Sequence, residues 1–335
     1  MLAAGGALTR SGATLALAVL AACGPAWPSS GAAPASDVEP PVPPLALVGR
    51  QVIDEASAPI WWAELATDGE RVLVAWAQGA RAYWAELDRD ARPRWRRELP
   101  FVPRRFGVVG GRAVFVVIDG GVRVCAAPSL RCELVSPEGQ VRVTFGSSEL
   151  ALDFGAAVVR YAPADGVRAI ERLPAALYRH AVQRDVRVAP CGEAWVVLGE
   201  EHVYRLGGGR LAPVERGSAL AIAGSRSFAL SRDGTSAVDL CSGHPLRAAR
   251  ASDSTVLAAF VGARGLATLR AWSSHDGGRS YHYDHGGRSE RFYRSADFDS
   301  RAPLVTAAHV DRRARLWLVV IEGHTLSVEL RESSR

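Results

Sequence analysis

A strand–turn–strand unit that recurs seven times along the chain is the feature that most restricts its fold. Each copy has an apolar strand, a turn that carries a glycine, and a second strand in which apolar and polar residues alternate. The turn glycines are Gly79, Gly120, Gly155, Gly199, Gly234, Gly277 and Gly323. Steps of 35–46 residues between these glycines, with several strands in each step, are typical of β-propeller blades. We therefore predict an all-β fold, a β-propeller of seven blades, with six or eight blades as alternatives.

A large β-sandwich or β-barrel is the alternative architecture, because strands spaced about 8–12 residues apart look similar locally. A further apolar strand, such as 61–65 or 304–308, precedes the hairpins. We count this strand as the second of a blade and therefore expect the glycine turns between the third and fourth strands. Glycine suits such turns because tight hairpins require a positive φ, which costs glycine little.

The N-terminus has the features of a bacterial export signal. Arg10 supplies a positive charge, and 13–22 form an apolar run that is shorter than the about 20 residues of a membrane-spanning helix. The run ends in Leu-Ala-Ala-Cys23-Gly24, which resembles the lipobox of bacterial lipoproteins. The resemblance implies cleavage before Cys23 and acylation of its sulfur. An ordinary secretory signal with an incidental cysteine is the alternative.

These features divide the chain into three parts: a signal peptide over 1–22, an acylated Cys23 with a tether to 44, and a propeller domain over 45–335. Seven prolines between 25 and 44 predict an extended tether. In bacterial lipoproteins an Asp after the acylated cysteine favours inner-membrane retention. Gly24 resembles the residues found in lipoproteins that travel to the outer membrane by default. We expect a protein anchored by its acyl chains in the outer membrane, facing the periplasm or the cell surface.

The net charge of the chain says little about its partners. The formal charge is +5, and the chain contains 40 arginines and no lysine. Such a complete bias is typical of a GC-rich genome, so the basic balance does not indicate a nucleic-acid partner. A hydrophobic content of 48% places the body of the chain among globular folds.

Four cysteines remain besides Cys23, namely Cys125, Cys132, Cys191 and Cys241. An even number in an oxidising compartment predicts two disulfides, and the spacing does not match a zinc site. In the expected register, the first two bracket a crossing between blades. Cys191 lies in a second-to-third turn, and Cys241 ends the neighbouring blade. Each pair then meets on one face, so we predict Cys125–Cys132 and Cys191–Cys241.

The segment 274–281 reads Ser-His-Asp-Gly-Gly-Arg-Ser-Tyr and resembles the Asp-box of bacterial-neuraminidase-type repeats. The matching positions are Ser274, Asp276, Gly277, Gly278, Ser280 and Tyr281. The resemblance implies a sialidase-like propeller in which the Asp staples a turn between the third and fourth strands, away from the catalytic face. No sialidase catalytic residue has a counterpart, because 101–104 (Phe-Val-Pro-Arg) have the residues of the family's first arginine segment in another order.

Arginines recur in the turns that we expect between second and third strands. They are Arg71, Arg112, Arg226, Arg264, Arg312 and Arg313. Glu149 and Glu193 occupy the same place in the third and fourth repeats. If the expected register holds, one side of the rim that these turns form is basic and could bind carboxylates or phosphates. Ordinary charged turns without a specific ligand are the alternative.

Histidines and aspartates near 275–285 look at first like metal ligands. His282 and His285, however, differ by an odd number of positions on a predicted strand and point to opposite faces. We therefore predict neither a metal site nor a cofactor. The common phosphate-binding, zinc-protease and hydrolase motifs are also absent from the sequence.

Taken together, these features predict a non-enzymatic platform that binds an envelope protein or a glycan. The alternative is a propeller glycosidase or lyase that acts on envelope or external glycans. A cluster of carboxylates and arginines would favour the enzyme, and an exposed apolar or aromatic rim would favour the platform.

Overall fold

The computed structural model describes residues 45–335 except for short gaps. The gaps are 69, 119, 138–140, 174–176, 178–186, 200, 217, 224–225, 232–235, 248–254, 263–264, 274–278, 286–287, 296–302, 311–314 and 334–335. The chain divides into two units, Met1–Pro41 and Val42–Arg335, and the described residues belong to the second. Within these ranges no helix is long and apolar enough to cross a membrane.

The described strands form seven antiparallel sheets of four strands each, which we number as blades 1–7. Blade 1 contains β2 (Ile60–Thr67), β3 (Val72–Gln78), β4 (Arg81–Leu87) and β5 (Pro93–Leu99). Blade 2 contains β6 (Pro103–Val109), β7 (Arg112–Val117), β8 (Val122–Ala126) and β9 (Arg131–Ser136). Blade 3 contains β10 (Arg142–Phe145), β11 (Leu150–Asp153), β12 (Ala157–Ala162) and β13 (Gly166–Arg172). Blade 4 contains β14 (Arg187–Cys191), β15 (Ala194–Leu198), β16 (His202–Arg205) and β17 (Arg210–Pro213).

The last three blades include the strand that joins the two ends of the described chain. Blade 5 contains β18 (Ala219–Ala223), β19 (Arg226–Leu230), β20 (Ser236–Asp239) and β21 (Pro245–Arg247). Blade 6 contains β22 (Thr255–Gly262), β23 (Gly265–Ser273), β24 (Arg279–His285) and β25 (Arg288–Ser295). Blade 7 contains β26 (Leu304–Val310), β27 (Leu316–Glu322), β28 (Thr325–Ser333) and, as its fourth strand, the N-terminal β1 (Leu45–Glu55).

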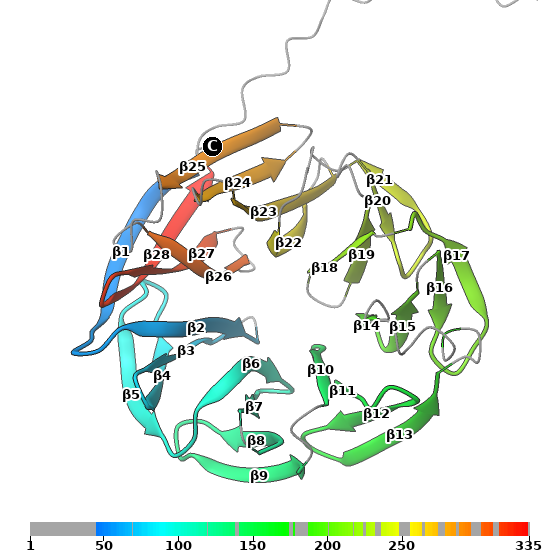
Figure 1. The fold of residues 1–335 in the computed structure, drawn as a ribbon, viewed down its shortest axis with the longest axis horizontal. Helices are drawn as coiled ribbons and strands as arrows, with labels where there is room; N and C mark the ends of the chain where they lie inside the picture. Colours follow the sequence, from blue (N-terminus) through cyan, green and yellow to red (C-terminus); the bar gives the residue numbers. More distant parts are fainter. Residues whose placement is uncertain are drawn as a thin grey trace, which may run out of the picture. The chain divides into compact units, whose positions relative to one another are not determined.

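The first strands of neighbouring blades contact one another in a closed circuit. β2 contacts both β6 and β26, and the sequence of contacts continues through β10, β14, β18 and β22 back to β26. Figure 1 shows the blades arranged around a common axis, with these first strands innermost. This arrangement confirms the predicted β-propeller and its seven blades.

The register within a blade differs from the prediction by one strand. The turn glycines, such as Gly79 between β3 and β4, lie between second and third strands rather than between third and fourth. The predicted arginine turns accordingly lie between first and second strands. The error arises because the outermost strand lacks an apolar pattern: β5 exposes most of its residues, whereas β3 is buried along nearly its whole length. An exposed polar strand has no alternation of apolar and polar residues by which the sequence would indicate a strand.

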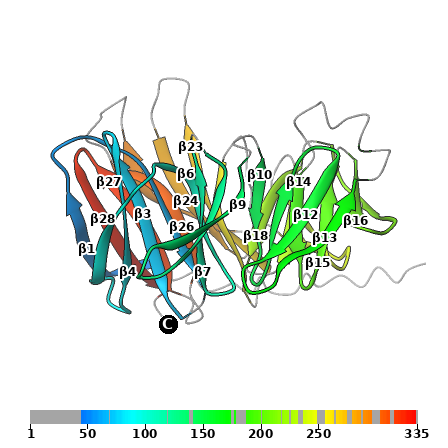
Figure 2. The ribbon, with the colours of Figure 1, turned by 90° about the horizontal axis from the view of Figure 1, so that it is seen from below.

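The antiparallel strands give each blade two ends, and Figure 2 shows the strands running between them. We call one end the N-terminal face, because Leu45 enters there opposite Ser333. It carries the turns between first and second strands, for example 110–111 and 146–149. We call the other end the crossing face. It carries the second-to-third turns and the connections from blade to blade, for example Phe101–Val102.

Both predicted disulfides, Cys125–Cys132 and Cys191–Cys241, are present. The first joins directly opposed residues of β8 and β9, which belong to one blade, so the expected crossing between blades was wrong. The second does join neighbouring blades. Cys191 ends the first strand of blade 4, and Cys241 follows the third strand of blade 5 instead of ending the blade. Both corrections follow from the same shift in register.

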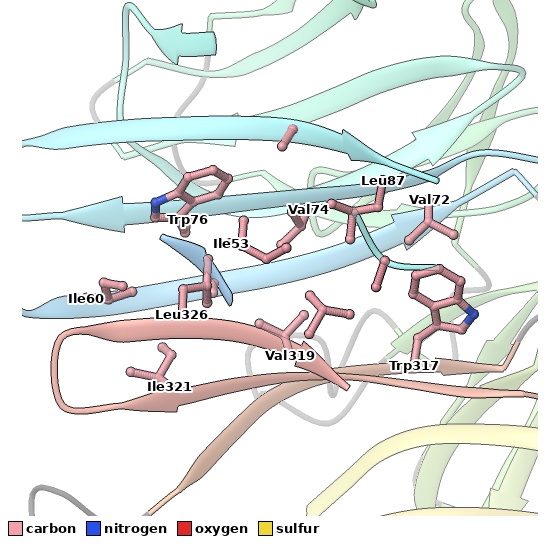
Figure 3. Close-up of a cluster of buried hydrophobic side chains, with 14 of the residues drawn as sticks. Ile53, Ile60, Val72, Val74, Trp76, Leu87, Trp317, Val319, Ile321 and Leu326 are labelled. Atoms are coloured by element: carbon pink, nitrogen blue, oxygen red, sulfur yellow. The ribbon is translucent and has the colours of Figure 1, made fainter. Parts of the chain in front are cut away.

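Blades 1 and 7 share a buried apolar cluster, which Figure 3 shows in close-up. Ile53 of β1 lies among Val74 and Trp76 of blade 1 and Val319 and Leu326 of blade 7. Each of these side chains is less than a tenth exposed. Burial of one such aliphatic side chain stabilises the folded state by about 1.5–3 kcal/mol, so β1 is attached by packing as well as by its pairing with β28.

A polar latch adds to this packing. The Asp54 carboxylate of β1 accepts hydrogen bonds from Trp76 Nε1 at 2.8 Å and from both terminal nitrogens of Arg96 at 2.8 and 3.0 Å. The Arg96 guanidinium also lies 4.4 Å from the centre of the Tyr83 ring. Asp54 is buried, and a bidentate arginine is the strongest partner for a buried carboxylate. The latch therefore ties the strand that closes the ring to three strands of blade 1.

We predict that Asp54→Asn lowers the free energy of unfolding by about 2–3 kcal/mol, because Arg96 loses its counter-charge and the buried indole N–H of Trp76 loses a charged acceptor. Chemical denaturation followed by tryptophan fluorescence measures the change. Asp165→Asn is the matched control, since Asp165 pairs with Arg168 at an exposed turn and such a pair contributes less than about 1 kcal/mol. Equal losses in the two variants would contradict the latch.

Candidate functional site

Arg71 of the predicted basic rim is held between two neighbouring blades on the N-terminal face. Its Nη2 donates to Asp68 Oδ2 at 2.8 Å and to the carbonyl oxygen of Gly111 in blade 2 at 2.6 Å. Burial acts to raise the pKa of Asp68, but the hydrogen bonds from the Arg71 amide and guanidinium outweigh it and hold this pKa below its usual value. Arg71 therefore acts as a link from blade 1 to blade 2.

The other rim arginines fall into three groups. Arg226 pairs with Asp239 of its own blade, and its guanidinium lies 5.3 Å from the centre of the Phe228 ring. Arg112 is exposed at the start of β7. Arg264, Arg312 and Arg313 lie outside the described residues. Arg71, Arg112 and Arg226 share the N-terminal face, whereas the predicted register had placed them on the face of the connections from blade to blade. An anion-binding role for this rim stays a prediction.

The two glutamates of the predicted rim belong to a junction between blades 3 and 4. Arg160 Nε donates to Glu149 Oε2 at 2.8 Å, and Arg160 Nη2 donates to the Glu193 carbonyl oxygen at 3.3 Å. Trp195 Nε1 of blade 4 donates to the same Glu149 carboxylate at 3.3 Å. Together with Arg71, these bonds show that polar side chains of the N-terminal face join successive blades.

The crossing face also exposes large apolar side chains. Trp61, Ile118 and Phe154 are 50%, 43% and 39% exposed, and they come from blades 1, 2 and 3. Trp61 is the second residue of β2, whereas Ile118 and Phe154 directly follow β7 and β11, the second strands of their blades. We call these three residues the apolar arc. The blades that carry it are β2–β5, β6–β9 and β10–β13 in Figure 1.

Hydrogen bonds fix the position of each residue in the apolar arc. The Trp61 indole N–H donates to the Gly79 carbonyl oxygen at 2.9 Å. The backbone amides of Ile118 and Phe154 donate to the carbonyl oxygens of Val102 and Ala157 at 3.1 and 2.9 Å. The arc is thus a set of apolar side chains on ordered backbone. Tryptophan and large apolar groups on a rigid surface are typical of protein interfaces.

Sequence reasoning missed the apolar arc because it treated turns as polar. A signal was available in the sequence. Ile118 precedes Asp119-Gly120, and Phe154 precedes Gly155, so each places a large apolar side chain where a blade turns and cannot bury it within the sheet. Trp61 lies near the start of a strand, next to a second tryptophan, and the alternation of a strand cannot bury both.

Below the crossing face, Glu64 lies between the first strands of blades 1 and 2. Its carboxylate in β2 accepts a hydrogen bond from the Phe106 amide of β6. Burial raises the pKa of Glu64 to about 7, although Arg105, the Phe106 amide and Trp62 act in the opposite direction. Glu64 therefore carries a proton for part of the time at neutral pH.

The predicted Asp-box is only partly within the described residues, which leave out Ser274, Asp276, Gly277 and Gly278. The segment lies between the second and third strands of blade 6, β23 and β24, one strand earlier than predicted. Ser280 and Tyr281 are buried, and the Tyr281 hydroxyl accepts a hydrogen bond from the Val305 amide of blade 7 at 3.0 Å. Among the residues described, no three His, Cys, Asp or Glu side chains gather as a metal site would require.

Comparisons with known proteins address the fold and not the function. No family model matches the chain, and no curated protein matches it. A chain of a mitotic checkpoint complex has a TM-score of 0.55 at 12% identity, covering 92% of this chain and 98% of that one. Hsv2 of Kluyveromyces lactis has a TM-score of 0.51 at 12% identity, over 79% and 90%. The N-terminal domain of Nup159 has a TM-score of 0.51 at 10% identity, over 86% and 95%. This chain is similar to them in its propeller fold.

We predict that Glu64→Gln removes most of the pH dependence of stability between about pH 5 and 8. The folded-state pKa of about 7 lies above the ordinary glutamate value of 4.5, so the folded protein holds this proton more tightly than the unfolded chain. The resulting stability is complete below about pH 4.5 and is lost as the pH rises through 7, a change of roughly 3 kcal/mol. Urea unfolding across this range measures it; a parallel decline in both proteins would contradict the assignment.

Proposed function

We propose that this chain is a lipid-anchored envelope protein whose propeller is a non-enzymatic platform for a protein partner, which docks on the crossing face. The observation that carries the proposal is the apolar arc, Trp61, Ile118 and Phe154, exposed on three successive blades. Exposed apolar side chains are unfavourable in water, and a partner that covers them lowers the free energy. A rigid propeller loses little conformational entropy when it binds.

The anchor is part of the same proposal. The sequence Leu-Ala-Ala-Cys23-Gly24 supports acylation of Cys23, and the proline-rich tether supports a separation between membrane and propeller. The propeller begins at Leu45 on the N-terminal face, at the other end of the blade from the crossing face.

We also infer that the 274–281 turn is an Asp-box of the neuraminidase type. Two of its matching residues support this inference, because Ser280 and Tyr281 are buried and Tyr281 contacts the next blade through its hydroxyl group. The role proposed for the box is structural, since the aromatic side chain fills the space between blades 6 and 7.

A glycosidase is less well supported than a platform. Most such enzymes need two carboxyl groups on either side of the bond that they cleave. Glu64 has the raised pKa of a candidate acid, whereas Asp54 is committed to Arg96 and Asp153 lies 3.1 Å from Arg142 Nε. Both aspartates are thus held in ion pairs with arginines.

Two of the similar folds are found in protein assemblies. One is a chain of a mitotic checkpoint complex, and Nup159 has been solved bound to dbp5 from S. cerevisiae. The identity to this chain is low, so these assemblies illustrate how the fold is used and do not identify a partner.

The test is a crosslinked pull-down from detergent-solubilised envelope with the full-length lipoprotein as bait. We expect a saturable protein partner, and we expect Ile118→Asp to reduce its recovery at least about tenfold, because a buried unpaired carboxylate is costly in an interface. Cys23→Ser bait tests whether recovery depends on the anchor.

Ile170→Asp is the matched control for this experiment. Ile170 is 70% exposed on β13, the outermost strand of blade 3, and so lies away from the apolar arc. Recovery with this variant should equal that with the wild type. The absence of any protein partner with wild-type bait, or equal losses with the two variants, would overturn the proposed docking face.

A further inference from the structure

Arginines gather at the crossing-face ends of the first strands, beside the apolar arc. Arg104 and Arg105 lie in β6 and Arg142 begins β10, and all three side chains are exposed. Arg104 Nη2 donates to the Val141 carbonyl oxygen at 3.4 Å, and Arg105 Nη1 donates to the Val143 carbonyl oxygen at 3.2 Å. The two guanidinium groups of blade 2 therefore reach to either side of Arg142 in blade 3.

The Arg105 guanidinium is held in place by uncharged contacts. The Arg105 guanidinium lies 5.3 Å from the centre of the Phe145 ring, and its hydrogen bond goes to a neutral carbonyl group. Its acidic neighbour Glu64 has a pKa raised to about 7. Carbonyl and aromatic contacts orient a guanidinium without cancelling its charge.

The same position in the next blade is also an arginine. Arg187 begins β14 and is exposed. In the strand register, Arg187 lies opposite Leu198, the last residue of the second strand, just as Arg142 lies opposite Asp153. Because β10 contacts both β6 and β14, the basic side chains extend over blades 2, 3 and 4. We call Arg104, Arg105, Arg142 and Arg187 the basic arc.

We infer that the basic arc binds an acidic segment of the protein partner, through carboxylate side chains that several arginines engage. This inference rests on the proposed function and adds the chemistry of the partner. Arginines on three blades fit an extended ligand with several negative charges better than one small anion. The neighbouring apolar arc, which starts at Trp61 in blade 1, favours a polypeptide, because a polypeptide can present apolar and acidic side chains together.

The experiment measures binding of fluorescein-labelled deca-glutamate to the full-length lipoprotein by fluorescence anisotropy at low and physiological salt. The test variant is Arg104→Gln with Arg105→Gln and Arg187→Gln, which leaves the Arg142–Asp153 pair intact. We expect this variant to bind the probe at least about tenfold more weakly than the wild type. Wild-type affinity should also fall as salt rises.

The matched control removes the same amount of charge elsewhere. Arg92→Gln with Arg131→Gln and Arg168→Gln changes three exposed side chains, of which Arg168 lies in β13 and the others at the N-terminal face. Its affinity for deca-glutamate should stay within about twofold of the wild type, because salt screens the attraction between the probe and arginines that lie more than about 10 Å from it. Equal weakening in both triple variants would overturn the inference, and so would binding of dextran sulfate but not of deca-glutamate.

The pull-down separates this inference from the proposed function. A partner recovered equally by the wild type and by the basic-arc variant would overturn the acidic segment and leave the platform standing. If the basic-arc variant binds deca-glutamate more weakly than the wild type does, but the wild-type bait recovers no partner, the result would support the site and contradict the platform. Thermal unfolding midpoints of both triple variants within about 2 °C of the wild type would show that each is folded.

Discussion

Closure of the ring by β1 is the constraint on which the rest of the structure depends. A propeller blade buries both faces of its sheet only when it has neighbours on both sides, so an open ring would expose the apolar surfaces of blades 1 and 7. The N-terminal strand prevents this by completing blade 7, by packing Ile53 into the cluster of Figure 3, and by binding Trp76 and Arg96 through Asp54. The strand that follows the predicted tether is therefore the strand that holds the ring together.

Closure has different consequences at the two faces. On the N-terminal face, the polar side chains of Arg71 and Arg160 and the Cys191–Cys241 disulfide join one blade to the next. The crossing face holds apolar side chains on a hydrogen-bonded backbone and arginines at the ends of inner strands. The first set of residues maintains the scaffold, and the second is available to a partner. Apolar and basic side chains on a rigid ring are the basis of the proposed binding platform.

The sequence predicted the blades from their buried second strands, because apolar residues and turn glycines recur wherever a strand lies between two sheets. It misplaced the register, since polar outermost strands such as β5 show no periodicity. The cysteine pairs were predicted correctly despite that error. A shift of one strand changes the face of every turn together, so two cysteines expected on the same face still lie on the same face. The roles of Arg71 and Glu149 could not be predicted, because each depends on a group from the neighbouring blade. The apolar arc was visible as single residues, but only the fold places them on one face.

The central claim is that a protein partner docks on the crossing face, and site-specific photocrosslinking in intact cells tests it most directly. A benzophenone side chain would replace Ile118 on the crossing face in one protein and Arg112 on the N-terminal face in another, both in the full-length chain. The account predicts a discrete protein adduct from position 118 that position 112 does not give. An adduct from position 112 alone, or the same adduct from both positions, would contradict it.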